Sequence, residues 1–171
     1  MLAQRFTMTK TYTDLPTSHR AWRHSGHCRF VHGYSRSFTL VFAASALDAC
    51  GFVVDFSSLK PLKAVLEHLF DHTTLINADD PELDTFRDLH ARELIDLRIV
   101  DHCGMEGGAM LVWELADALV RAQTGGRAWC ISCEARENVK NAVTYRVPED
   151  GSAASTRPFP TAPFGIDWTR G

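Results

Sequence analysis

The fold is decided by the run Gly33-Tyr34-Ser35-Arg36-Ser37-Phe38-Thr39-Leu40-Val41-Phe42. Side chains in a β-strand point alternately to its two faces, so residues two apart share a face. The run therefore predicts a strand over residues 33–46 with one mainly apolar or aromatic face. The residues that share this face are Tyr34, Arg36, Phe38, Leu40 and Phe42.

Strand and helix patterns alternate along the rest of the chain. Apolar residues at helical spacing from Leu59 to Leu69 predict an amphipathic helix that begins after Ser57 or Ser58, either of which can cap it. Two more helices are predicted, one over residues 82–95 and one from residue 107 or 108 to 123, which a pair of glycines ends. The other predicted strands cover residues 3–13, 52–56, 97–100, 128–137 and 141–147.

These elements predict one α+β domain over residues 1–148. From Pro148 onward the chain holds four of its seven prolines, together with glycine, serine and alanine. Residues 149–171 are therefore predicted to form an extended or disordered C-terminal tail.

Composition and charge are those of a globular protein. Of the 171 residues, 45% are apolar and 23% are charged, and the formal net charge is −3. This charge provides no basic surface for nucleic acid, and no apolar run is long enough to span a membrane. The chain shows no signal-peptide pattern and its five cysteines are an odd number, which predicts reduced thiols in the cytoplasm.

Side chains that can move protons occur at three places in the sequence. Cys28 precedes His32 by four residues, the pair Asp71-His72 follows the amphipathic helix, and Glu137 begins the run before the last strand. A thiol, an imidazole with a carboxylate beside it, and a separate carboxylate are a set that enzymes use for acid–base chemistry. The set predicts an enzyme, provided that the fold brings these residues together.

The order and spacing of several motifs resemble the 6-pyruvoyltetrahydropterin synthase and 6-carboxytetrahydropterin synthase family over about residues 5–148. These motifs are Ser18-His19-Arg20, Cys28 with His32, Val54 to Lys60, Leu69-Phe70-Asp71-His72, and Glu137 with Asn141 and Tyr145. The resemblance implies the T-fold, a four-stranded antiparallel sheet with two main helices on one face. It also implies homo-oligomeric rings, typically hexamers made of two trimers, with active sites between subunits.

The resemblance further implies a substrate and a role for each candidate residue. The family acts on 7,8-dihydroneopterin triphosphate, a small-molecule pterin. Cys28 would be the general base, and Asp71 with His72 would form a relay that handles the second proton. Glu137 would anchor the pterin ring, because a carboxylate can accept two parallel hydrogen bonds from an aminopyrimidinone edge. Glu106 lies where many members carry a second pocket glutamate.

The metal site departs from the family pattern. Family members hold zinc with three histidines, two of them from a His-Gly-His motif, whereas this chain has His32-Gly33-Tyr34. Zinc takes imidazole, thiolate or carboxylate ligands far more often than phenolate. Three interpretations stay open: a site of His19, His32 and a third donor such as Tyr34 or His27, a site with water in the gap, or no zinc. We favour a bound zinc ion as the cofactor.

The sequence thus predicts a lyase that acts on the side chain of a reduced pterin. The family carries out triphosphate elimination to the 6-pyruvoyl product, or side-chain cleavage to 6-carboxytetrahydropterin for 7-deazaguanine and queuosine synthesis. The four-residue spacing between Cys28 and His32 favours the carboxy branch. The alternative is a T-fold protein that binds a pterin or purine and has lost catalysis together with the usual zinc site.

Overall fold

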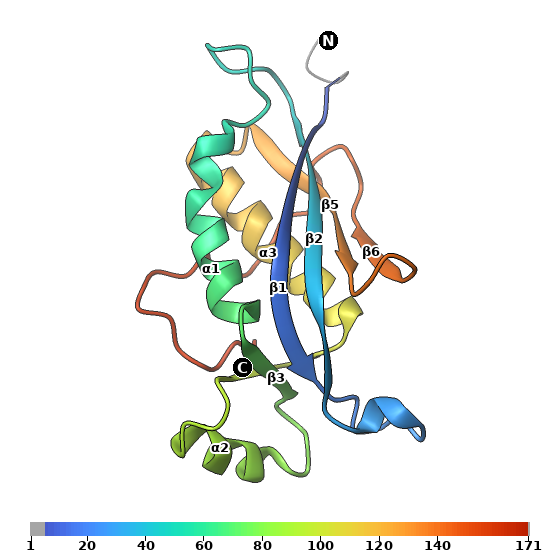
Figure 1. Cartoon of the computed structure of the whole chain (residues 1–171). Helices are drawn as coiled ribbons and strands as arrows, with labels where there is room; N and C mark the ends of the chain where they lie inside the picture. The colour runs from blue at the N-terminus through green and yellow to red at the C-terminus, as the bar shows by residue number, and fades with distance from the viewer. Residues whose placement is uncertain (1–5, 171) are drawn as a thin grey trace.

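A six-stranded sheet forms the centre of the protein, which the computed structural model describes from residue 6 to residue 170. The strand order is β4-β3-β1-β2-β5-β6, in which β1, β2, β5 and β6 are antiparallel neighbours while β3 and β4 run parallel to β1 (Figure 1). The strands are β1 (Met8–His19), β2 (His32–Ala44), β3 (Thr73–Asn77), β4 (Leu97–Val100), β5 (Ala128–Arg136) and β6 (Ala142–Arg146). Residues 1–5 and 171 of the predicted domain and tail lie outside the described residues.

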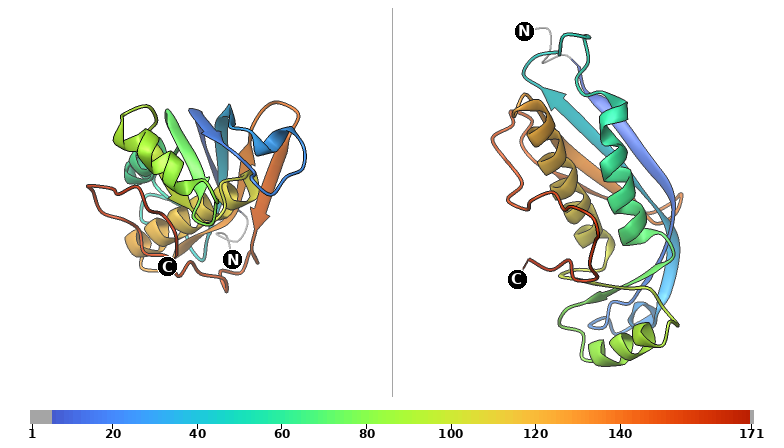
Figure 2. Two further views of the ribbon diagram at one scale, coloured as in Figure 1. Left: turned by 90° about the horizontal axis from the view of Figure 1, so that it is seen from below. Right: turned by 90° about the vertical axis from the view of Figure 1, so that its left-hand side faces the viewer.

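Two long helices cover one face of the sheet. Helix α1 (Lys60–Phe70) lies against β1 and β3, and α3 (Met105–Thr124) lies against β5 and β6 (Figure 2). The shorter α2 (Leu83–Ala91) packs near β3 and β4, and two 3-10 turns, η2 (His27–Arg29) and η3 (Phe56–Leu59), complete the elements. The predicted α+β class with two main helices on one face is confirmed by this arrangement.

The core lies between the sheet and these two helices. On β2, Phe38, Leu40 and Phe42 are fully buried, so the predicted shared face of this strand is confirmed. Leu62 and Leu66 of α1 are likewise fully buried, in line with the predicted apolar face of that helix. This continuous apolar layer fixes the register of β2, because a shift by one residue would expose every one of these side chains.

The predicted sheet of four strands is wrong, because β3 and β4 add two more. The antiparallel part does have four strands, and β4 coincides with the strand predicted over residues 97–100. Strand β3 escaped prediction because four of its five residues are buried, so it lacks the alternation of a half-exposed strand. A short parallel strand of this kind is covered on both faces and leaves little periodic signal.

The predicted strand over residues 52–56 is also wrong. Residues 52–55 form a loop that leads into η3, and the Asp55 carboxylate accepts a hydrogen bond from the backbone N–H of Ser57 at 2.8 Å. Asp55 therefore caps η3, whereas α1 follows Leu59 without a side-chain cap, so the cap predicted at Ser57 or Ser58 is wrong. In contrast, the glycine pair does end α3, and Gly125 adopts a left-handed conformation with φ +60°.

Strand β1 extends six residues beyond its predicted end at residue 13. The register with β2 shifts between Tyr12 and Leu15, where Asp14 has φ +62°, and pairing then continues through Pro16 to His19. An irregularity of this kind redirects a strand without ending it. This extension places His19 on the sheet, directly opposite the first residue of β2.

The described residues after Pro148, up to residue 170, form no helix or regular strand and lie against α3 and β4. Trp168 is buried, its backbone N–H donates to the carbonyl of Ile99 at 2.8 Å, and Arg157 forms an ion pair with buried Glu114 at 2.9 Å. The outer edge of β4 is therefore partly covered by this segment. None of the helices in residues 6–170 combines the length and the apolar character needed to cross a membrane.

Candidate active site

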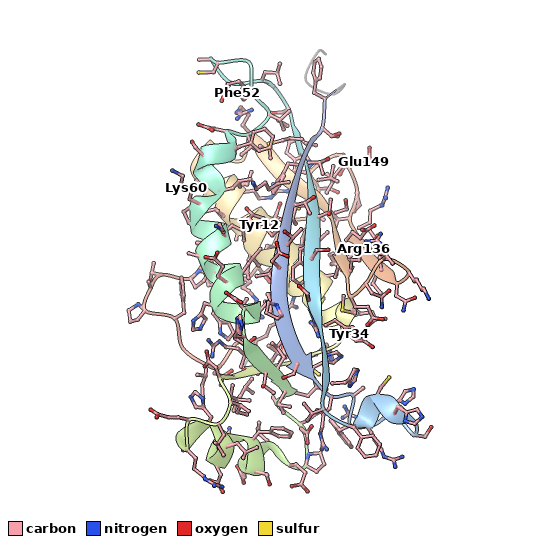
Figure 3. The ribbon with its side chains drawn as sticks, in the orientation of Figure 1. Tyr12, Tyr34, Phe52, Lys60, Arg136 and Glu149 are labelled. Carbon is pink, nitrogen blue, oxygen red and sulfur yellow. The ribbon has the colours of Figure 1, made fainter. Side chains whose placement is uncertain are left out.

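Strand pairing gathers three of the four predicted metal donors at one end of the sheet. His19, the last residue of β1, lies directly opposite His32, the first residue of β2, and their ring centroids are 4.5 Å apart. Tyr34, labelled in Figure 3, follows on the same face of β2. Its ring lies edge-on to that of His32, with the centroids 6.0 Å apart. His27 lies apart from the strands, on the exposed turn η2.

His19 is the most deeply buried member of this group. Its exposed fraction is 6%, and its Nδ1 atom has no hydrogen-bond partner among the described residues. Burial, together with the nearby charges of Arg36 and His32, lowers the pKa of His19 to about 3. The imidazole is therefore neutral at physiological pH, with an unpaired nitrogen.

A buried arginine lies on the same face of β2. Arg36 is completely enclosed, and its Nη2 donates to the carbonyl of Cys103 at 2.9 Å, while Nε and Nη1 have no partner among the described residues. Burial lowers the pKa of Arg36 to about 10, although Cys103 and Glu137 counteract part of this effect. The guanidinium therefore keeps its positive charge at neutral pH.

The donor set does not match a zinc centre of three imidazoles. Within residues 6–170, no group of three or more His, Cys, Asp or Glu side chains is arranged so that it could hold a metal ion. His19 and His32 supply two imidazoles, and the adjacent third group is the phenol of Tyr34. Protein zinc sites take three or four ligands drawn from imidazole, thiolate and carboxylate, so the residues present do not fit zinc.

Cys28 lies on the loop that joins β1 to β2. Its thiol is free and exposed on η2, and its backbone carbonyl accepts a hydrogen bond from Ala21 at 2.8 Å, which closes the loop. The loop extends past the end of β1 where His19 and His32 lie (Figure 1). The predicted base therefore lies in a segment connected directly to the histidine pair.

Asp71 and His72 form the predicted pair at the end of α1. Their side chains are joined by a hydrogen bond of 2.6 Å between His72 Nδ1 and Asp71 Oδ1. His72 has φ 58°, an uncommon conformation for a residue with a side chain, and its imidazole is 85% exposed. Neither side chain is hydrogen-bonded to Cys28 in the described part of this single chain.

The two predicted substrate-binding glutamates lie at the ends of β5 and α3. Glu137 follows β5, and its Oε1 accepts hydrogen bonds from the side-chain amides of Asn138 at 3.2 Å and Asn141 at 2.9 Å. Because both amides bind Oε1, Oε2 has a free acceptor position for a ligand. Glu106 is exposed in the first turn of α3, where the N–H groups of the helix end favour a negative charge.

Arg36 and Gly108 belong to this site, although their sequence positions alone predicted no role for them. A Cβ atom at Gly108 would lie 3.3 Å from Arg36 Nη1, closer than ordinary van der Waals contact, so glycine makes room for the guanidinium. The sequence did contain one signal, since Arg36 is the only charged residue in the alternating apolar face quoted above. A buried charge without a paired charge beside it is costly and indicates a special role.

Residues 7–148 match the sequence model of a family described as 6-pyruvoyl tetrahydropterin synthase. A 6-carboxy-5,6,7,8-tetrahydropterin synthase from Rickettsia conorii is 32% identical over 71 residues, which are 41% of this chain and 51% of that protein. The enzyme of the same name from Bacillus subtilis is 28% identical over 127 residues, 74% of this chain and 75% of that one. The match thus spans about half the length of the Rickettsia relatives.

Solved structures share the fold at low sequence identity. An uncharacterised protein from Wolinella succinogenes superposes with a TM-score of 0.68 at 19% identity, over 82% of this chain and 97% of that one. The 6-pyruvoyl tetrahydropterin synthase of Caenorhabditis elegans gives a TM-score of 0.55 at 17% identity, over 84% and 96% of the two chains. These similarities show the fold alone.

Proposed function

Because the chain belongs to the 6-pyruvoyl tetrahydropterin synthase family, we propose that it is a lyase acting on the side chain of 7,8-dihydroneopterin triphosphate. The observation that carries this proposal is the family match over residues 7–148, which include every candidate site residue. The names of the relatives favour the carboxy branch, with 6-carboxytetrahydropterin as the product and 7-deazaguanine synthesis as its use. The five cysteines are all free thiols, which supports a reducing compartment such as the cytoplasm.

Glu137 has the arrangement that an anchor for the pterin ring needs. The amides of Asn138 and Asn141 hold its carboxylate in one orientation through Oε1. A carboxylate that is already oriented loses little conformational entropy when it accepts hydrogen bonds from a ligand. In the proposed complex, Glu137 receives the amino and ring N–H groups of the pterin, and Glu106 completes the pocket.

Cys28 and the pair Asp71–His72 are the proposed proton handlers. Both groups are exposed, and they lie on different elements of one chain without a mutual hydrogen bond. We therefore place the complete site between subunits, where Asp71–His72 of one copy would face Cys28 of another. In this arrangement Cys28 removes a proton from the substrate side chain, and His72, oriented by Asp71, handles the second proton.

The open edges of the sheet support assembly into rings. Strand β3 pairs with β1 only from Thr17 to His19, so residues 8–15 of β1 have no neighbour on that side within the described chain. Strand β6 is the other terminal strand of the sheet, and no described strand pairs with its outer edge. Unpaired strand edges promote association unless they are covered, and ring closure by further copies would cover both.

We expect the purified protein to be a homo-oligomer, with a hexamer of two trimers as the proposed state. Light scattering coupled to size-exclusion chromatography at micromolar protomer concentration measures the mass directly. A monomer of 19.1 kDa under these conditions would contradict both the assembly and the site between subunits.

We expect the protein to convert 7,8-dihydroneopterin triphosphate to 6-carboxytetrahydropterin, with the products identified by mass spectrometry. The 6-pyruvoyl product would support the lyase but assign the chain to the other branch of the family. Tight binding of the substrate without any turnover would instead support a pterin-binding protein, the alternative function.

A further inference from the structure

Arg36 places a positive charge on the face of β2 that also carries His32 and Tyr34. The inner face of β2 presents His32, Tyr34 and Arg36 in one row, and His19 lies opposite His32. The guanidinium is completely buried, yet Nε and Nη1 have no partner among the described residues. Buried N–H groups are almost always paired, so two unpaired nitrogens on a charged side chain indicate that the site has a use for them.

The surrounding residues enclose this guanidinium closely. The carbonyl of Cys103 accepts from Nη2 at 2.9 Å, and the Phe70 ring centroid is 5.9 Å from the central carbon of the guanidinium. Gly108 of α3 leaves the space that Nη1 occupies, because a Cβ atom there would be only 3.3 Å away. Strand β2, which carries Arg36, and helix α3, which is far from it in the sequence, thus together enclose the guanidinium.

The charge of Arg36 is not neutralised by a direct ion pair. Arg98, the other arginine that is almost fully buried, is paired with Asp96, and partly buried Arg20 is paired with Asp80 at 2.6 Å. Arg36 has no such partner in the described part of the chain, and its one hydrogen bond goes to a neutral carbonyl. The positive charge of Arg36 therefore acts on the neighbouring imidazole of His19.

We propose that Arg36 replaces the metal ion of this site, so that the His19–His32 pair binds no zinc and the guanidinium supplies the positive charge. A divalent cation beside the two imidazoles would be repelled by the buried guanidinium, and His19, His32 and Tyr34 do not make a suitable set of three ligands. The ligand atom that this charge attracts is an electron-rich oxygen of the pterin side chain. The identity of this ligand rests on the proposed function.

Four proteins test this inference: the natural chain, Tyr34→His, Arg36→Met, and the double variant. Each is freed of metal and titrated with zinc against a competing chromophoric chelator, and the loaded zinc is then measured by elemental analysis. We expect less than about 0.1 zinc ion per chain for the natural protein and both single variants. We expect about one zinc ion per chain for the double variant, which has three imidazoles and no guanidinium.

Three results would overturn the inference. These are one tightly bound zinc ion in the natural protein, equal zinc binding by Tyr34→His and the double variant, and no zinc binding by a folded double variant. Circular dichroism and light scattering establish whether each variant folds, and the first result needs no variant at all. Zinc content is measured without any turnover, so failure of this inference is separate from failure of the proposed lyase activity.

Discussion

Replacement of Cys28 by alanine is expected to lower the turnover of 7,8-dihydroneopterin triphosphate by about 10²–10⁴-fold, the usual contribution of a positioned general base. The thiol is exposed on η2, and the hydrogen bond from Ala21 that closes this loop uses the backbone carbonyl of Cys28, which alanine keeps. The variant should therefore fold and assemble like the natural protein while lacking the group that removes the proton. Steady-state kcat and kcat/KM, measured over a pH series, report this loss.

Cys50→Ala is the matched control for this experiment. Cys50 is also a free, exposed thiol, but it lies in the loop between β2 and η3, at the opposite end of the sheet from η2 (Figure 1). Its replacement should leave kcat/KM within about twofold of the natural value, as for most surface substitutions away from a site. An equal rate for Cys28→Ala and the natural protein would exclude Cys28 as the base.

The sequence predicted most of the fold because its main elements carry strong periodic patterns. The alternation of β2 and the apolar face of α1 are both found as expected, with Phe38 and Leu66 fully buried. The failures concern short segments in which local pattern and tertiary context disagree. Strand β3 is buried on both faces, whereas the apolar residues Val53 and Val54 are buried in a loop without pairing to a strand.

The candidate site was predictable only in part. The pairing of His19 with His32 and the hydrogen bond between Asp71 and His72 could be anticipated from motif order and from adjacency in the sequence. The surroundings of Arg36 could not, because they depend on the carbonyl of Cys103, just before α3, and on Gly108 in α3, about seventy residues later. Nor can the order of residues in one chain show whether Cys28 meets Asp71–His72 of the same copy or of another.

Phe38→Ala is expected to lower the free energy of unfolding by about 3–5 kcal/mol, the typical cost of removing a buried phenylalanine ring. Phe38 is fully buried in the centre of β2, and its ring centroid lies 4.7 Å from that of Phe70 on α1. Its ring also borders the space at Gly108, where a Cβ atom would lie 3.6 Å from Phe38 Cε1. The substitution therefore opens a cavity between β2, α1 and α3.

Phe56→Ala provides the comparison, since Phe56 lies on η3 with 58% of its surface exposed and should change the free energy by less than about 1 kcal/mol. Guanidinium denaturation at one fixed protomer concentration gives both values, because assembly adds to the measured stability. A loss below about 1 kcal/mol for Phe38→Ala would mean that the β2–α1 contact is not part of the core. Phe38 also packs beside the space that holds the guanidinium of Arg36. The cavity left by Phe38→Ala should therefore allow Arg36 to move from its fixed position. We expect turnover to fall even when the variant is fully folded in the absence of denaturant.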